Sequence, residues 1–235
     1  MSQAIREPFI TLFVAAAGMG RRMNQAINKQ FLLIQNKPIL QHTLERFKDI
    51  SSINHVLIIA REGEEDQVAK ILAQADLPQA TSIVTGGKER QDSIARGLEA
   101  MPPQTDLVLT HDGARPFVSR EEVESIISAS LAHGACCLMT PLKDTLKISQ
   151  DGKWVDYTPN RDNLFSVQTP QGFSKSILIR AYKQAYEENY YGTDDCSLVE
   201  KTGQRVHLVK GSYNNIKITT KEDLILAEAI AKKCL

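Results

Sequence analysis

The segment of residues 9–31, FITLFVAAAGMGRRMNQAINKQF, constrains this chain more than any other. An apolar run typical of a buried strand ends in three alanines, and the glycine turn Gly18-Met19-Gly20 follows directly. Glycines let the backbone bring its N–H groups close to an anion, and Arg21, Arg22 and Lys29 add three cations. Because open α/β sheets bind ligands at the carboxyl ends of their strands, the segment predicts a polyphosphate site.

Other interpretations of this glycine turn differ in how well they fit. The third glycine of a dinucleotide fingerprint is absent, and no GK[ST] follows at the distance that a P-loop requires. Taken alone, the turn is equally consistent with a tight strand-to-helix connection that carries solvated arginines. Any ligand here is expected to be held by arginine and lysine more than by a helix N-terminus.

Composition predicts one globular domain over residues 1–235, with 42% hydrophobic residues. Its 28 basic and 28 acidic residues cancel, so no global field favours nucleic acid or an anionic membrane as a partner. The four cysteines form no CxxC pair, and the chain shows neither a leader pattern nor a long apolar span. We therefore expect a soluble cytoplasmic protein with reduced thiols.

Apolar runs alternate with amphipathic helical patterns along most of the chain. This alternation predicts an α/β fold: a Rossmann-like, mostly parallel mixed sheet with helices on both faces. Ser119 and Glu122 form a capping box that marks one helix start clearly. Strands are predicted over residues 9–16, 55–60, 82–84, 107–110, 135–140, 165–169, 206–210 and 216–218. Helices are predicted over residues 38–49, 64–74, 89–99, 120–133 and 175–189, and from about residues 193 and 220.

Residues 141–161 interrupt this alternation. The sequences TLKIS and WVDY read as two short strands around an Asp-Gly turn, which predicts a projecting β-arm. Such an arm offers a self-complementary contact for a homodimer. The alternative is that Trp154 and Tyr157 fold back and cover the domain's own core.

The sequence TGGKERQDS places two glycines before a predicted helix start. Without side chains, Gly86 and Gly87 would let a flat base lie against the backbone, and Ser93 would be available to hydrogen-bond it. A plain turn explains the pattern nearly as well.

The sequence LTHDGARPF places Asp112 just beyond a predicted strand, followed by Arg115. A carboxylate beside a polyphosphate can hold Mg²⁺ or a ribose hydroxyl, since Mg²⁺ commonly takes one or two protein oxygens. An Asp-Gly pair is also an ordinary turn signal.

The C-terminal half adds two further cations near element ends, Arg161 and Lys217. In the sequence NIKIT, Lys217 lies between Ile216 and Ile218, so in a strand its side chain faces opposite to theirs. It then points either to solvent or into the site, and periodicity alone favours solvent.

Seven motifs occur in order: AAAGMGRRM with NKQF, GGKERQDS, HDGARPF, KDT, TPQGF, TDDCSLVE and GSYNNIKIT. Together they resemble the 2-C-methyl-D-erythritol 4-phosphate cytidylyltransferases of the non-mevalonate isoprenoid pathway. The resemblance covers almost the whole chain and implies a fold of the nucleotide-diphospho-sugar transferase type. It also implies the substrates CTP and 2-C-methyl-D-erythritol 4-phosphate, the cofactor Mg²⁺ and a homodimer.

The resemblance further implies roles for individual residues. Arg22 and Lys29 would steady charge on the α-phosphate, and Arg161 and Lys217 would position the sugar phosphate. Asp112 would lie near the ribose and the metal. The glycine turn and the cytosine contacts correspond to Gly18, Gly20, Ala16, Ala17, Gly87 and Ser93. The residues around methylerythritol phosphate correspond to Arg115, Thr169, Thr193 and Thr145, with Thr145 coming from the partner subunit.

Two rival functions remain open from the sequence. A ribitol 5-phosphate cytidylyltransferase has similar motifs, although the AAAGMG turn and TDDCSLVE favour methylerythritol phosphate. A nucleotide-binding regulatory module without turnover would not need both pairs of cations. The five histidines show neither metal-ligand spacing nor a triad pattern, and we interpret them as surface or structural residues.

Overall fold

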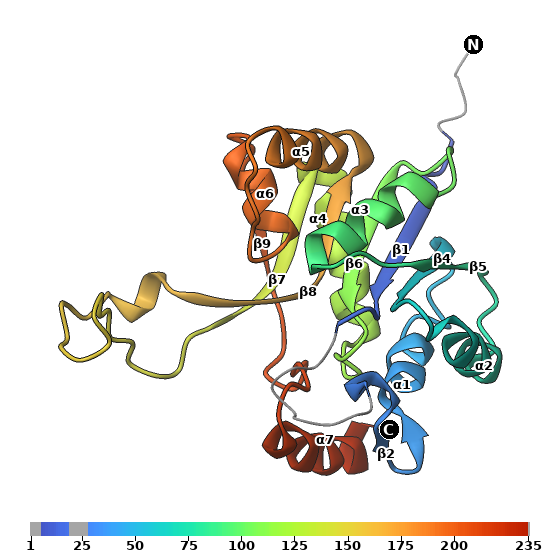
Figure 1. Cartoon of the computed structure of the whole chain (residues 1–235), viewed down its shortest axis with the longest axis horizontal. Helices are drawn as coiled ribbons and strands as arrows, with labels where there is room; N and C mark the ends of the chain where they lie inside the picture. Colours follow the sequence, from blue (N-terminus) through green and yellow to red (C-terminus); the bar gives the residue numbers. More distant parts are fainter. Residues whose placement is uncertain (1–5, 19–27, 235) are drawn as a thin grey trace.

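The computed structural model describes residues 6–18 and 28–234. Within these ranges the chain forms a seven-stranded sheet in the order β5-β4-β1-β6-β8-β7-β9, together with a small two-stranded sheet (Figure 1). The main sheet consists of β1 (Ile10–Ala15), β4 (Ile53–Ala60), β5 (Ala80–Thr85), β6 (Leu107–Asp112), β7 (Ala135–Pro141), β8 (Phe165–Ser174) and β9 (His207–Lys210).

Most strand pairs in the main sheet are parallel, as the alternating pattern predicts. β1 pairs in parallel with β4 on one side and with β6 on the other, and β4 pairs in parallel with β5. β8 is the exception, because it runs antiparallel to both β6 and β7. The carboxyl ends of β1 and β6 therefore lie side by side at one edge, with Ala15 opposite Asp112.

Helices cover both faces of the main sheet, which confirms the sequence prediction. One apolar cluster joins α1 (Ile39–Glu45), α2 (Glu65–Ala75) and α4 (Arg120–His133) to the sheet. A second cluster joins α3 (Arg90–Ala100), α5 (Lys175–Glu187) and α6 (Asp195–Lys201) to the opposite face. Strands such as β1 and β4 are buried on both sides, which explains their continuous apolar runs.

A third apolar cluster lies beside the carboxyl ends of the strands. It brings α7 (Lys221–Cys234) against the hairpin of β2 (Leu33–Ile34) and β3 (Lys37–Pro38). The final helix was predicted from the sequence, whereas the hairpin was not. Ile218, just before α7, is fully buried in this cluster. The last helix thus anchors the segment that leads to it. No helix within the described ranges is both long and apolar enough to cross a membrane.

Residues 142–164 leave the sheet between β7 and β8 as a projecting arm (Figure 1). The prediction of two short strands in it was wrong, since one isolated bridge between Ile148 and Tyr157 is the only pairing there. The arm's side chains lie at the surface: Trp154 is 77% exposed and Tyr157 is 59% exposed. They do not cover the domain's own core, so the fold-back alternative was wrong for this chain.

Two other predicted elements differ from the structure. Residues 216–218 form no strand, because the backbone N–H of Ile218 donates to the carbonyl of Ala114 beyond the end of β6 instead of joining a ladder. β8 continues to Ser174, five residues past the predicted end. The capping box of Ser119 and Glu122 is present, and α4 covers the predicted residues 120–133.

Candidate active site

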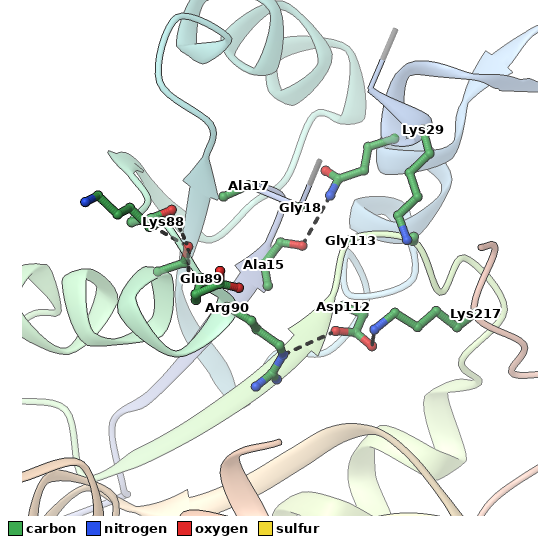
Figure 2. Close-up of a pocket in the computed structure, with 14 residues that line it drawn as sticks. Ala15, Ala17, Gly18, Lys29, Lys88, Glu89, Arg90, Asp112, Gly113 and Lys217 are labelled. Carbon is green, nitrogen blue, oxygen red and sulfur yellow. Dashed lines mark hydrogen bonds and ion pairs between the residues drawn. The ribbon is translucent and has the colours of Figure 1, made fainter. Parts of the chain in front are cut away.

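A pocket of about 290 Å³ opens at the carboxyl ends of β1 and β6 (Figure 2). It lies where the sequence predicts the polyphosphate site. Among the described residues, five parts of the chain contribute to it: the end of β1, residues 29–30, the loop before α3 with the first turn of that helix, residues 112–114 at the end of β6, and the segment before α7. The predicted site residues that line it are Ala17, Gly18, Lys29, Gly87, Ser93, Asp112 and Lys217.

Asp112 lies at the end of β6 within a ring of cations. Its Oδ2 atom is 2.9 Å from Nζ of Lys217 and 3.3 Å from Nε of Arg115, and its Oδ1 atom is 3.7 Å from Nε of Arg90. Figure 2 shows Arg90 and Lys217 approaching the carboxylate from opposite sides. The side chain of Lys217 thus reaches into the site. The sequence pattern had left open whether it points there or to solvent.

The charge state of Asp112 follows from this ring. Burial disfavours the ionised carboxylate, but Lys217, Arg90 and Arg115 outweigh that cost and hold the pKa of Asp112 well below its usual range. The site therefore holds a fixed anion. More cations than acids surround it, which suits an anionic ligand.

Lys29 comes from a short 3-10 helix, Lys29–Phe31, that follows the glycine turn. Its side chain is 9% exposed, and its Nζ donates to the carbonyl of Ile218, 3.1 Å away. Gln30 donates to the carbonyl of Ala15 and so fastens this helix to the end of β1. The structure thus brings Lys29 and Lys217 to the same pocket.

The loop before α3 has the close packing that its glycines permit. A Cβ on Gly86 would lie 2.7 Å from the Cβ of Ala17, and one on Gly87 would collide with the side chain of Asp92. The hydroxyl of Ser93 accepts from the N–H of Gly87 and donates to the carbonyl of Glu89. Ser93 lines the pocket and also fixes the loop.

Sequence reasoning missed a second layer behind the pocket. Arg90, which lines the pocket, forms a bidentate pair with the fully buried Asp195 at 2.9 and 2.8 Å. Thr110 and Tyr182 also donate to Asp195, each at 2.6 Å. The only signal in the sequence was the placement of Arg90 and Asp195 within two of the quoted motifs.

Other predicted residues lie near the pocket without lining it. The side chain of Ala16 packs in the core, and Arg115 holds both Asp112 and the carbonyl of Asn215. The hydroxyl of Thr169 accepts from the backbone N–H of Asp112 at 3.0 Å. Thr193 is exposed just before α6.

The two predicted residues on the arm are not brought to this pocket. Thr145 and Arg161 are exposed, and the Arg161 guanidinium donates to the carbonyl of Lys143 within the arm itself. Gly20, Arg21 and Arg22 lie outside the described residues.

The histidine nearest the pocket is structural. His111 is fully buried, with one ring nitrogen 3.1 Å from the carbonyl of Arg115 and the other 3.1 Å from the hydroxyl of Thr169. Burial lowers its pKa to about 4, so the ring is neutral near pH 7. This agrees with the sequence interpretation that the histidines are not catalytic.

A mixed α/β sheet with a cationic pocket at its switch in strand order, between β1 and β6, defines a nucleotide-binding protein of the nucleotidyltransferase type. The family described as IspD, 2-C-methyl-D-erythritol 4-phosphate cytidylyltransferase, matches residues 10–233. The chain belongs to this family.

Individual relatives agree with this assignment. The 2-C-methyl-D-erythritol 4-phosphate cytidylyltransferase of Desulforamulus reducens is 43% identical over 225 residues, which covers 95% of this chain and 96% of the relative. The protein of the same name from Clostridioides difficile is 44% identical, with 94% of this chain and 92% of the relative covered.

Solved structures share the fold over nearly the full length. A crystal structure of 4-diphosphocytidyl-2C-methyl-D-erythritol synthase from Anaerococcus prevotii superimposes with a TM-score of 0.86 at 35% identity, covering 97% of this chain and all of the solved one. The cytidylyltransferase from Thermus thermophilus gives a TM-score of 0.78 at 34% identity, with 95% and 99% covered.

Proposed function

We propose that this chain transfers the cytidylyl group of CTP to 2-C-methyl-D-erythritol 4-phosphate. The products are 4-diphosphocytidyl-2-C-methyl-D-erythritol and pyrophosphate, and the reaction belongs to isoprenoid precursor biosynthesis. The family match and the relatives' names carry the substrates. In the molecule itself, the observation that carries the proposal is the ring of cations around Asp112 in a pocket that Lys29 also lines.

The chemistry fits a pocket built from cations. A phosphate oxygen of the sugar attacks the α-phosphorus of CTP, a new P–O bond forms, and the bond to the bridging oxygen of the leaving pyrophosphate breaks. The attacking oxygen is already an anion, so no serine, cysteine or general base is needed. Catalysis reduces to holding two anions in line and offsetting their repulsion.

The cytosine of CTP, its phosphates and the sugar phosphate are assigned to different parts of the pocket. We assign Ala17, Gly87 and Ser93, the last two from the loop before α3 and its first turn, to the cytosine end, and Gly18 to the phosphates. Lys29, together with Arg22, would stabilise charge on the α-phosphate, and Lys217 would position the sugar phosphate. Lys29 donates to the carbonyl of Ile218, the residue that follows Lys217, so the two lysines are held by the same short segment.

Magnesium fits this pocket as an ion held mainly by the nucleotide. Within residues 6–18 and 28–234, no group of three or more His, Cys, Asp or Glu side chains is arranged to hold a metal ion. Asp112 is ionised, and among the described residues its Oδ1 atom has only the long 3.7 Å contact with Arg90, so it can supply one oxygen. Bound Mg²⁺ would neutralise charge on the phosphates of CTP.

The arm completes the proposal. The arm that carries the exposed Thr145 and Arg161 extends away from the main sheet of its own subunit (Figure 1), and we assign both residues to the pocket of a partner subunit in a homodimer. The exposed Trp154 and Tyr157 would then be buried in that contact. We further propose that the enzyme works in the cytoplasm.

Pyrophosphate release tests this function. The purified protein is incubated with CTP and Mg²⁺ and with either 2-C-methyl-D-erythritol 4-phosphate or ribitol 5-phosphate. We expect release with the first acceptor and far less with the second. The opposite preference would favour the ribitol enzyme. CTP binding without release with either acceptor would favour a regulatory module.

A further inference from the structure

Asp195 is a buried carboxylate that the proposed chemistry does not use. Its side chain is 0% exposed, and it accepts hydrogen bonds from two Nη groups of Arg90, from Thr110 and from Tyr182. These partners belong to α3, β6 and α5, whereas Asp195 begins α6. One carboxylate therefore ties four elements together behind the pocket.

Burying a carboxylate is costly unless it is paired and fully hydrogen-bonded. Burial opposes ionisation of Asp195, but Arg90, Thr110 and Tyr182 outweigh it and lower the pKa of this carboxyl. Removing one member of such a pair leaves an uncompensated buried charge. The network is thus a strong constraint on where Arg90 can lie.

Arg90 faces the pocket with one edge only. One N–H of each Nη group donates to Asp195, and Nε faces Asp112 Oδ1 at 3.7 Å, which is longer than a hydrogen bond. A free guanidinium beside a carboxylate would prefer a bidentate pair. In that arrangement Arg90 would compete with Lys217, which lies 2.9 Å from Oδ2 of the same carboxylate.

We propose that Asp195 is a positioning residue that acts through Arg90. By pairing with the end of the guanidinium, it holds the Nε edge of Arg90 3.7 Å from Asp112, short of the bidentate pair that this edge could otherwise make, and so leaves Asp112 Oδ2 to Lys217 and Arg115. The inference rests on the proposed function, because Asp112 and Lys217 matter only if this pocket binds the substrates. Asp195 itself touches no reacting atom, since it lies wholly behind the pocket.

A double-variant cycle in kcat/KM for CTP tests this role. Asp195→Asn, which keeps the side chain's shape, should lower kcat/KM at least about tenfold, the ratio expected for one lost charged hydrogen bond. Arg90→Gln should also lower it. The double variant should be no slower than Arg90→Gln alone, because Asp195 then has nothing left to orient.

Asp194→Asn is the matched control, because Asp194 is adjacent and caps α6 by accepting from the N–H of Ser197. Because asparagine caps a helix about as well as aspartate, it should leave Tm close to wild type and kcat/KM within about threefold of wild type. If Asp195→Asn does not fold, Tyr182→Phe removes one donor to Asp195 and keeps the ion pair. We expect it to lower kcat/KM modestly in the wild-type background and not at all in the Arg90→Gln background.

The outcomes separate the two proposals. A wild-type protein that releases no pyrophosphate overturns the proposed function, and this inference falls with it. An active wild type in which the losses of Asp195→Asn and Arg90→Gln multiply independently overturns the inference alone. So does Asp195→Asn at wild-type kcat/KM, or Tyr182→Phe with equal effects in both backgrounds.

Discussion

The Nζ atom of Lys217 lies 2.9 Å from Oδ2 of Asp112, although Asp112 ends a strand in the middle of the chain and Lys217 lies just before the last helix. The contact depends on how residues 215–218 are held. Lys29 donates to the carbonyl of Ile218, Arg115 donates to that of Asn215, and the N–H of Ile218 donates to Ala114. The N-terminal, central and C-terminal parts of the chain thus meet at one carboxylate.

Replacing Lys217 should therefore affect the acceptor more than the nucleotide. Lys217→Met should lower kcat/KM for 2-C-methyl-D-erythritol 4-phosphate about 10- to 100-fold, because a charged hydrogen bond to the sugar phosphate is lost. CTP affinity measured by calorimetry should stay close to wild type. Lys210→Met, at an exposed lysine on β9, is the control. A large loss of CTP affinity would move Lys217 to the nucleotide side of the pocket.

Lys29 is expected to act mainly in the transition state. Lys29→Ala should lower kcat on the order of 10²–10³ with a smaller effect on CTP binding, because its partner gains charge as the P–O bond breaks. Arg22→Ala should behave alike. Steady-state kinetics at saturating substrates measures the effect, with the exposed Lys70→Ala as control. Near-wild-type turnover would show that the assignment to the transition state is wrong.

The arm should couple assembly to activity. Replacing residues 143–161 by a short Gly-Ser turn removes Thr145, Arg161 and the exposed aromatic side chains together. We expect a folded monomer that binds CTP and has little transferase activity, measured by light scattering, calorimetry and pyrophosphate release. A monomer of this variant that turns over like wild type would contradict the proposed dimer site.

Mixing two inactive chains gives a sharper form of the same test. The armless chain keeps an intact pocket, and Lys29→Ala keeps an intact arm. In a heterodimer the arm of the second chain can serve the pocket of the first, so the mixture should regain activity that neither chain has alone. Armless chains mixed with a Lys29→Ala chain that also carries Arg161→Ala should regain much less.

The stability of the fold should fall in mild acid partly because of His42. His42 is 3% exposed, its Nε2 lies 2.8 Å from the carbonyl of Ile34, and its Nδ1 has no hydrogen-bond partner among the residues that the structure describes. Burial lowers the pKa of His42 below its ordinary value of 6.5. Below pH 6.5 the unfolded chain therefore binds a proton at His42 more readily than the folded protein does. Its contribution is complete above pH 6.5 and is lost as the pH falls below it, by up to about 1.4 kcal/mol per pH unit.

Urea denaturation of wild type and His42→Gln at pH 7.5, 6.5 and 5.5 measures this contribution. Glutamine keeps a polar group beside the carbonyl of Ile34 but does not titrate. The variant should be less stable at pH 7.5, with a shallower fall in unfolding free energy toward pH 5.5. Equal slopes for the two proteins would show that His42 does not titrate on unfolding.

Much of this fold follows from the pattern of the chain, and the reasons are local. β1 and β4 are continuous apolar runs, and the capping box at Ser119 marks the start of α4. Alternation also placed the side chain of Lys217 opposite to Ile216 and Ile218, even though these residues pair with no strand. Parallel strands then brought Gly18 and Asp112 to one edge of the sheet.

Tertiary contacts determine the features of the fold that the sequence pattern does not predict. The antiparallel course of β8 depends on its pairing with β6 and β7, which no local signal in the segment encodes. The pair of Arg90 and Asp195 joins α3 to α6, and each residue alone looks like an ordinary polar side chain near a helix start. The arm's extended stretches have almost no partner within the chain, so their strand-like sequence forms a single bridge.

The way the arm joins the sheet affects which sequence changes the fold can tolerate. Pro141 pairs with Phe165, and the arm is the connection between two adjacent antiparallel strands. Insertions, deletions or exchanges between these two residues leave the register of every strand pair intact. The surface that would choose a partner can therefore be rewritten in evolution, or grafted by an engineer, while the residues that the main sheet contributes to the pocket at the ends of β1 and β6 keep their places.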